Sequence, residues 1–107
     1  MAQLDLTFKA LGDPKRRLIL ARLARGDAVV GELVGPLKIS WPAVTRHLQV
    51  LERAGLIEQV REGNHRRCRL RAKPMREARD WIGRYEAFWS DQLDALHGYF
   101  AGGGRNN

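Results

Sequence analysis

The side chains with the most specific chemistry in this chain lie between Ser40 and Gln49. Arg46 and Gln49 are three positions apart, a spacing that brings both to one face of a helix. A guanidinium matches the O6 and N7 acceptors of guanine, and a carboxamide pairs with adenine in the same bidentate way. Outside a suitable framework such a pair is most often a solvated helix face, so its meaning depends on the elements that position it.

These residues are predicted to lie on a helix from Trp41 to about Ala54. Ser40 is a good N-cap, and Pro42 falls in the first turn, where its missing N–H does no harm. Gly55 ends the helix. One face repeats at i, i+4 and i+7 and forms a buried stripe of Val44, Leu48 and Leu51. The opposite face is polar and is expected to point outward.

Three shorter helices are predicted before it, over residues 4–11, 14–25 and 29–37. Asp13 is a candidate N-cap for the second of these, and Gly26 is a candidate C-cap. The apolar stripe of this second helix would consist of Leu18, Ile19, Ala21 and Leu23. Two short helices joined by a tight turn, the second with a polar outward face, describe a helix-turn-helix.

The chain then changes from a helical to a two-residue period. Residues 56–61 and 66–71 are predicted to be the strands of a hairpin, because a Gly-Asn turn signal lies between them. The tip of this hairpin is basic. A last helix is predicted from Pro74 to about Phe100, and residues 101–107 are predicted to be a disordered tail. We therefore expect one domain over residues 1–100.

The charge of the chain is concentrated in one segment. Nineteen Lys and Arg against twelve Asp and Glu give the 107 residues a net charge of +7, and residues 61–79 alone carry +6. Such a surplus indicates a polyanionic partner, either nucleic acid or an acidic membrane surface. No signal peptide is recognisable, and no stretch approaches about 18 uncharged apolar residues, so we expect a soluble cytoplasmic protein without a membrane partner.

The predicted fold class is mainly α with a small β-hairpin wing, a winged helix-turn-helix with a long C-terminal dimerisation helix. The runs FKALGDPKRRLILARLARG and VGELVGPLKISWPAVTRHLQVLERAGLIEQVREGNHRRCRL resemble the ArsR/SmtB family of dimeric bacterial winged-helix transcriptional repressors. The most specific part is the pattern Ser-x-x-x-Val-x-x-His-Leu-x-x-Leu from Ser40 to Leu51. Leu-Gly-Asp-Pro before an Arg-rich helix, and Ala-Gly-Leu-Ile before the hairpin, add to it.

The resemblance implies a homodimer that represses transcription by binding double-stranded DNA at a palindromic operator. The recognition helix would begin at Ser40, and the hairpin tip would contact the flanking phosphates or the adjacent minor groove. The predicted DNA-binding residues are Ser40, Trp41, Pro42, Thr45, Arg46, His47, Gln49, Arg53, Arg61, Asn64, His65, Arg66 and Arg67. The alternative is a non-specific or architectural nucleic-acid binder. An enzyme is not expected, because no catalytic grouping or phosphate-binding glycine loop is recognisable.

The resemblance also implies that the first and last helices pack in the dimer. The predicted interface residues are Leu4, Phe8, Trp81, Tyr85, Phe88, Trp89, Leu93, Leu96 and Phe100. A ligand pocket is the alternative reading of the aromatic stripe in the last helix. We favour an interface, because so long an apolar face exceeds what this small domain can cover by itself.

Many members of the family sense metals, but this chain lacks the ligands of two metal sites that are common among them. A common thiolate site has Cys-x-Cys after a Glu-Leu pair, where this chain has Val34-Gly35-Pro36. A second site needs paired histidines on the last helix, which offers only His97. We therefore expect no metal and no cofactor. The inducer stays open between a small molecule, a redox change at Cys68, and no signal beyond the expression level.

For three residues the sequence allows two roles each. Trp41 either contacts a thymine methyl group or sugar, or packs on the preceding helix or on the partner subunit. His47 either bonds to a phosphate or packs between helices. Cys68 lies beside two arginines that would lower its pKa if it were exposed, although a lone cysteine in a strand is more often structural.

Overall fold

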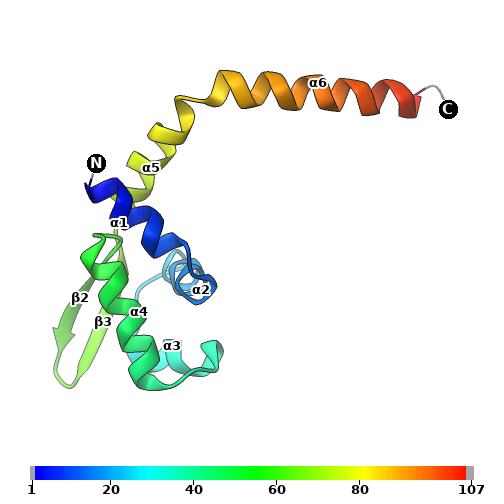
Figure 1. Cartoon of the computed structure of the whole chain (residues 1–107). Helices are drawn as coiled ribbons and strands as arrows, with labels where there is room; N and C mark the ends of the chain where they lie inside the picture. Colours follow the sequence, from blue (N-terminus) through cyan, green and yellow to red (C-terminus); the bar gives the residue numbers. More distant parts are fainter. Residues whose placement is uncertain (1, 106–107) are drawn as a thin grey trace.

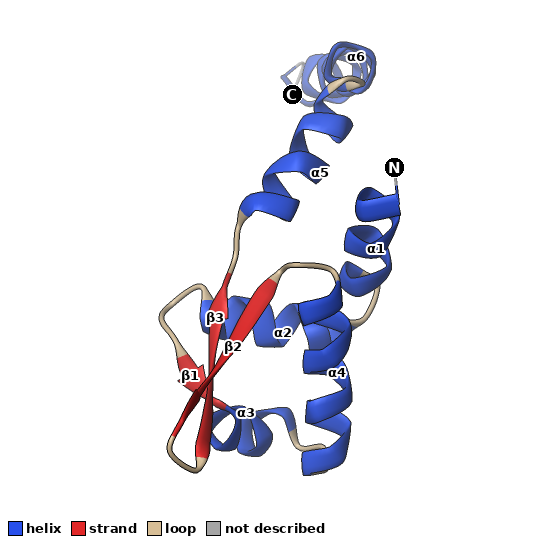
Figure 2. Ribbon diagram, turned by 90° about the vertical axis from the view of Figure 1, so that its left-hand side faces the viewer, coloured by secondary structure: helices blue, strands red, loops and turns tan. Residues whose placement is uncertain are grey.

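The computed structural model describes residues 2–105 of the chain as six helices and three short strands (Figures 1 and 2). In chain order these elements are α1 (Ala2–Leu11), α2 (Pro14–Leu23), β1 (Ala28–Val29), α3 (Val30–Leu37), α4 (Trp41–Arg53), β2 (Ile57–Glu62), β3 (His65–Leu70), α5 (Lys73–Gly83) and α6 (Glu86–Arg105). The mainly α fold with a β wing is confirmed. No helix within residues 2–105 has the length and apolar composition needed to cross a membrane.

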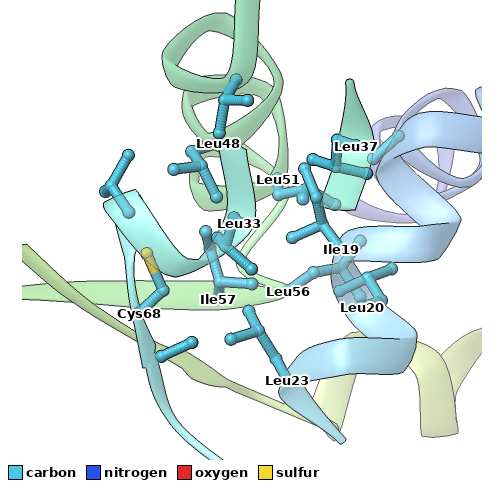
Figure 3. Close-up of a cluster of buried hydrophobic side chains, with 14 of the residues drawn as sticks. Ile19, Leu20, Leu23, Leu33, Leu37, Leu48, Leu51, Leu56, Ile57 and Cys68 are labelled. Atoms are coloured by element: carbon cyan, nitrogen blue, oxygen red, sulfur yellow. The ribbon is translucent and has the colours of Figure 1, made fainter. Parts of the chain in front are cut away.

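The hydrophobic core lies between α2, α3, α4 and the sheet (Figure 3). The predicted stripe of α4 is confirmed, because Val44, Leu48 and Leu51 are all buried. The predicted stripe of α2 is wrong in part: Ile19, Leu20 and Leu23 are buried, whereas Leu18 is 55% exposed and Ala21 is exposed. The helix is therefore rotated about its axis relative to the face that the sequence suggested.

The basic residues at the start of α2 explain this rotation. Lys15 Nζ donates to the carbonyl of Leu37 at the end of α3, at 2.9 Å. Arg17 Nη1 donates to the carbonyl of Leu11 at the end of α1, at 2.7 Å. Positive charges at helix C-termini satisfy carbonyls that have no partner within their own helix. These side chains lie against neighbouring helices, although the sequence suggested a solvated polar face.

The helix-turn-helix consists of α3, a short turn and α4. Lys38 ends α3 in the left-handed conformation, with φ 57°, and the chain reverses there. Ser40 Oγ then accepts the backbone N–H of Ala43 at 3.2 Å, so the predicted N-cap of α4 is confirmed. At the other end Gly55 has φ 75°, which a residue with a Cβ adopts only with strain. Both ends of α4 are thus fixed by local sequence.

The wing has three strands, one more than the sequence predicted. β2 and β3 form the expected antiparallel hairpin around a turn in which Gly63 has φ 59°. The additional strand, β1, pairs with the other side of β3, where Ala28 lies opposite Cys68. Residues 28 and 29 were assigned to a loop and a helix start, because two residues are too few to show an alternating pattern. This strand joins the wing to the start of α3.

The predicted continuous helix from Pro74 to Phe100 is wrong. Two i→i−3 bonds, from the N–H of Arg84 to the carbonyl of Trp81 and from the N–H of Tyr85 to that of Ile82, tighten the chain and end α5. Gly83 lies at this break, and glycine is unfavourable inside a helix. The second piece, α6, projects away from the body (Figure 1) and includes residues 101–105 of the expected tail, while residues 106 and 107 lie outside the described part.

Candidate nucleic-acid interface

The outer face of α4 carries the side chains that the sequence selected. Pro42, Arg46, Gln49 and Arg53 are exposed along it, and Thr45 is half-buried. The face is available because the opposite side of α4 is fixed in the core by its leucine stripe. A helix held in this way presents a rigid row of donors and acceptors, and it has the dimensions that fit a B-DNA major groove.

Trp41 lies over α3 at the start of this face. A Cβ built on Gly31 would be 3.6 Å from Cη2 of the indole, so the ring lies against the backbone of α3. The side chain nevertheless keeps 56% of its surface exposed. Packing on the preceding helix, one of the two readings of Trp41, is therefore present. The remaining exposed surface faces a hollow beside α4.

This hollow has a volume of about 530 Å³ and lies between α4 and the wing. It brings together residues from α4, from the start of α3, from β2, and from the hairpin turn with the start of β3. These residues are Val30, Gly31, Trp41, Thr45, Gln49, Gln59, Asn64, His65 and Arg66. Six of these nine were predicted DNA-binding residues. A concave surface lined by such hydrogen-bonding groups can follow a nucleic-acid backbone beside the helix.

Gln59, Val30 and Gly31 were missed as lining residues. Gln59 lies opposite Cys68 in the strand register, and Cys68 is fully buried. Directly opposed residues of paired strands point to the same face of the sheet, so Gln59 faces α4. Its side-chain amide donates to Glu52 of α4 at 3.4 Å. The strand alternation of buried and exposed positions, extended from Cys68 to its partner strand, would have identified Gln59 as a residue that faces α4.

The arginines of β3, and Arg71 directly after it, separate by the same alternation. Arg66 is two positions from Cys68 and lines the hollow. Arg67, Arg69 and Arg71 belong to the other face, where each meets a carboxylate. Arg67 donates to Glu62 at 3.0 Å, a bond that raises its pKa further. The strongly basic segment is therefore partly neutralised. Among the described residues, Arg67 is the one predicted DNA-binding arginine that has an acidic partner.

Four other predicted arginines are free of acidic partners. Within residues 2–105, no ion pair involves Arg46, Arg53, Arg61 or Arg66, and all four are exposed. Arg61 bonds only to the carbonyl of Gly63, at 3.3 Å. Unpaired guanidinium groups on α4 and on the wing are the charges with which this surface can neutralise phosphates.

His47 faces the body of the protein. Its Nδ1 lies 3.3 Å from Nη1 of Arg16, and the side chain is half-buried. Of the two interpretations of His47, packing between helices is therefore the one supported by an observed contact. Because an arginine has only donors, Nδ1 accepts this bond, and the proton of the neutral ring is on Nε2. Nε2 is left as the donor with which the ring can bond a phosphate.

Cys68 is completely buried, on the face of β3 that packs against the core. Burial raises the pKa of its thiol to about 11, and nearby Glu52 adds to the rise. Arg66 opposes it but does not compensate. A thiol in this state is protonated near neutral pH and inert, which favours the structural reading of the residue over the redox one. Among the described residues, no three metal-ligating side chains gather into one site.

The predicted dimer residues lie on α1, α5 and α6, except Tyr85, which lies in the turn between α5 and α6. Phe8 and Trp81 touch within the chain, with ring centroids 5.6 Å apart, and Trp81 in turn contacts Tyr85 at 5.4 Å. Leu4 is half-buried. The remaining described members stay largely uncovered, since the exposed fractions are 52% for Tyr85, 68% for Phe88, 54% for Leu93 and 52% for Leu96. The side chains of Trp89 and Phe100 lie outside the described part.

Comparison with known proteins gives a consistent result. Residues 13–59 match the model of the family described as bacterial regulatory protein, arsR family. The chain is 39% identical over 95 residues to the HTH-type transcriptional regulator Rv2034 of Mycobacterium tuberculosis, covering 89% of this chain and 83% of that protein. It is 33% identical over 75 residues to the transcriptional repressor SdpR of Bacillus subtilis, covering 70% and 83%.

A solved structure shares the fold. It is the homodimeric winged helix-turn-helix DNA-binding domain of Mb0332 from Mycobacterium bovis, with a TM-score of 0.62 and 26% identity. The match covers 92% of this chain and 84% of that one. Sequence and architecture therefore agree over the helix-turn-helix, the wing and most of the flanking helices.

Proposed function

Because the chain belongs to the arsR family of bacterial regulatory proteins, we propose that it is a homodimeric transcriptional repressor that binds palindromic operator DNA. The observation that carries the proposal is the hollow between α4 and the wing. Hydrogen-bonding side chains of the helix lie on one side of it, and those of the hairpin turn lie on the other. Resemblance to a named repressor and to a homodimeric DNA-binding domain supports the same conclusion.

In this proposal α4 enters the major groove. Arg46 and Gln49 read base edges, since both are exposed one turn apart on the outer face. Arg66 and Asn64 follow the adjacent phosphates from the wing, and they fix the position of the helix without reading sequence. Two copies of α4 in successive major grooves would require half-sites about one helical turn apart. The bound dimer would obstruct polymerase sterically.

The proposed dimer is supported by the uncovered apolar face of α6. Phe88, Leu93 and Leu96 are more than half exposed on a helix that projects from the body (Figure 1). An apolar face of this length on one element marks an interaction surface. A second copy of the same helix is its natural cover, because a two-fold axis pairs identical patches.

Binding measurements on three variants test base reading. Arg46→Ala and Gln49→Ala should each lose about 1–3 kcal/mol on the operator and little on random DNA, because only specific binding uses base edges. Arg66→Ala should weaken binding to both DNAs to a similar degree. Fluorescence anisotropy with the fragment upstream of the gene and with a scrambled fragment, both near physiological salt, measures these losses.

Lys9→Gln is the charge-matched control, since Lys9 is exposed on α1, does not line the hollow beside α4 and is not among the predicted DNA-binding residues. It should bind both fragments like the unaltered protein. If all three variants lost equal affinity for operator and random DNA, base reading by α4 would be wrong. The chain would then be a non-specific or architectural binder, which is the alternative function.

A further inference from the structure

A second hollow lies between α2 and α3, and it shares no lining residue with the hollow beside α4. It has a volume of about 410 Å³ and is lined mainly by apolar side chains, among them Leu18, Ala21, Leu33 and Pro36. Leu18, which the sequence placed wrongly on the buried face of α2, is 55% exposed and lines this hollow. Small-molecule sites in proteins have this size and this apolar character, with a few polar groups that orient the ligand.

The charged residues of this hollow are not equivalent. Glu32 is engaged twice: Oε2 lies 3.6 Å from Nη2 of Arg22, and Oε1 accepts the backbone N–H of Val29 at 3.0 Å. Arg22 is also engaged, because its Nη1 donates to the carbonyl of Gly26 at 2.9 Å. Arg25 lines the same hollow and is exposed, and within residues 2–105 no ion pair or side-chain hydrogen bond involves it. The hollow therefore has an apolar floor and one unused positive charge.

We propose that this hollow binds a small amphipathic organic anion, whose carboxylate pairs with Arg25 and whose apolar body covers Leu18 and Leu33. The charge complementarity selects an anion, because the only carboxylate among the lining residues, Glu32, already has a cationic partner. The apolar lining selects a hydrocarbon or aromatic body over a sugar or a nucleotide. This site goes beyond the proposed function and does not depend on DNA binding.

Isothermal titration calorimetry of the full chain without DNA tests the site, with decanoate and 1-decanol as the probes. The two ligands share the apolar body and differ in the charged group. Decanoate should bind the unaltered protein with one site per chain and more tightly than 1-decanol, because a charge-assisted pair with Arg25 adds to the burial of the alkyl chain. Failure of decanoate to bind at millimolar concentration would overturn the proposal.

Two variants place the site. Arg25→Gln should weaken decanoate binding about tenfold and leave 1-decanol unchanged, as expected for the loss of a single charged pair. Arg76→Gln removes a charge from the exposed face of α5 and lines none of the hollows described, so it should bind decanoate normally. Equal binding by Arg25→Gln and Arg76→Gln would overturn the role of Arg25.

Ala21→Trp fills the hollow from an exposed position on α2. It should abolish binding of both ligands, and unchanged circular dichroism and thermal unfolding would show that the fold is intact. Unchanged decanoate binding in this variant would place the ligand elsewhere, for example on the apolar face of α6. If Ala21→Trp instead altered the sedimentation of the protein and left decanoate binding unchanged, a second copy of the chain would be the occupant, and the ligand proposal would be wrong.

Discussion

Arg16 links three helices through one guanidinium. Its Nε donates to the carbonyl of Ala10 at 2.7 Å, and its Nη2 donates to that of Lys9 at 3.1 Å. Nη1 lies 3.3 Å from Nδ1 of His47 on α4. The end of α1, which belongs to the proposed dimer surface, is thereby connected to the helix proposed to read DNA. Asp13, three residues earlier, accepts the N–H of Arg16 at 3.2 Å and holds the start of α2.

Removal of this guanidinium should destabilise the fold. Arg16→Met keeps the apolar stem but leaves the carbonyl of Ala10 and His47 without this donor, while the carbonyl of Lys9 keeps the N–H of Gly12. We therefore expect a loss of about 1–3 kcal/mol in the free energy of unfolding. Urea denaturation followed by circular dichroism measures it. Lys9→Met is the control, because no hydrogen bond of the Lys9 side chain is observed within the described residues. Equal stability of the two variants would show that the Arg16 contacts contribute nothing.

Cys68 should make the stability depend on pH in the alkaline range. Its folded-state pKa, about 11, exceeds the ordinary value of 9.0 because burial disfavours the thiolate. Between these two values the folded state holds the proton that the unfolded state releases, so stability is full below about pH 9 and falls as the pH rises toward 11. Cys68→Ala should lose this component. Urea midpoints of both proteins at about pH 8 and about pH 10 test it, and parallel decreases would contradict the assignment.

At the scale of elements, the recognition helix depends on how it begins. Ser40 accepts the N–H of Ala43 and closes the first turn of α4 directly after the left-handed Lys38. The turn and the cap together determine where the exposed face of the helix starts. Trp41, the next residue, then lies against Gly31 of α3.

Loss of this cap should cost about 1 kcal/mol. Ser40→Ala leaves the N–H of Ala43 without an acceptor, whereas Ser40→Asp keeps an acceptor and adds a charge that suits a helix N-terminus. We expect the Ala variant to unfold at a lower urea concentration and the Asp variant to match the unaltered protein. A destabilised Asp variant would mean that the cap is not what Ser40 contributes to stability.

The elements also show which structural signals are local. The N-caps Asp13 and Ser40, the glycine stop after α4 and the stripe of α4 were predictable, because each depends on residues within one or two turns. The C-cap of α2 was predicted wrongly, since Ala24 and not Gly26 caps that helix. The face of α2 was not predictable, because the side chains of Lys15 and Arg16 run to carbonyls at the ends of α3 and α1, and only the packing of the helices brings these carbonyls within reach. The strand β1 was not predictable either, since only its pairing with β3 defines it. The break after α5 depends on Gly83, whose weak signal was outweighed by the continuous aromatic pattern around it.

The candidate interface was predicted unevenly for the same reason. The exposed residues of α4 followed from its helical period, and the predicted hairpin placed Asn64, His65 and Arg66 together at its tip. The charge of residues 61–79 overstated what is available to phosphates, because Arg69 and Arg71 pair with Asp27 and Glu58 on the outer side of the sheet. Ion pairs across strands are set by register, which a count of charges does not contain.

At the scale of the whole molecule, the shape itself indicates a missing partner. The radius of gyration is 18.7 Å and the extents are 63 × 34 × 21 Å, whereas a compact domain of 100 residues has a radius of gyration near 13 Å. The excess comes from α6, which extends from the body as a separate helix (Figure 1). An amphipathic helix gains most of its stability from packing, so this one needs a surface to pack on.

Charges on its apolar face should therefore separate the dimer. Leu93→Asp and Leu96→Asp should give a monomer at micromolar concentration in sedimentation velocity, because a carboxylate in an apolar interface is costly. Ala87→Asp adds the same charge to an exposed position near the start of α6, roughly on the opposite side from Leu96. It should remain dimeric. A monomeric unaltered protein would remove the basis for the proposed dimer.

The position of Trp41 gives the protein an internal optical label. The other two tryptophans, Trp81 and Trp89, lie on α5 and α6, so one indole stands at the proposed DNA surface and two belong to the helices proposed to dimerise. With the two C-terminal indoles replaced by phenylalanine, emission from Trp41 would report occupancy of the hollow beside α4. With Trp41 replaced instead, emission would follow the association of subunits. The two events can thus be observed separately in one cuvette, without an attached dye.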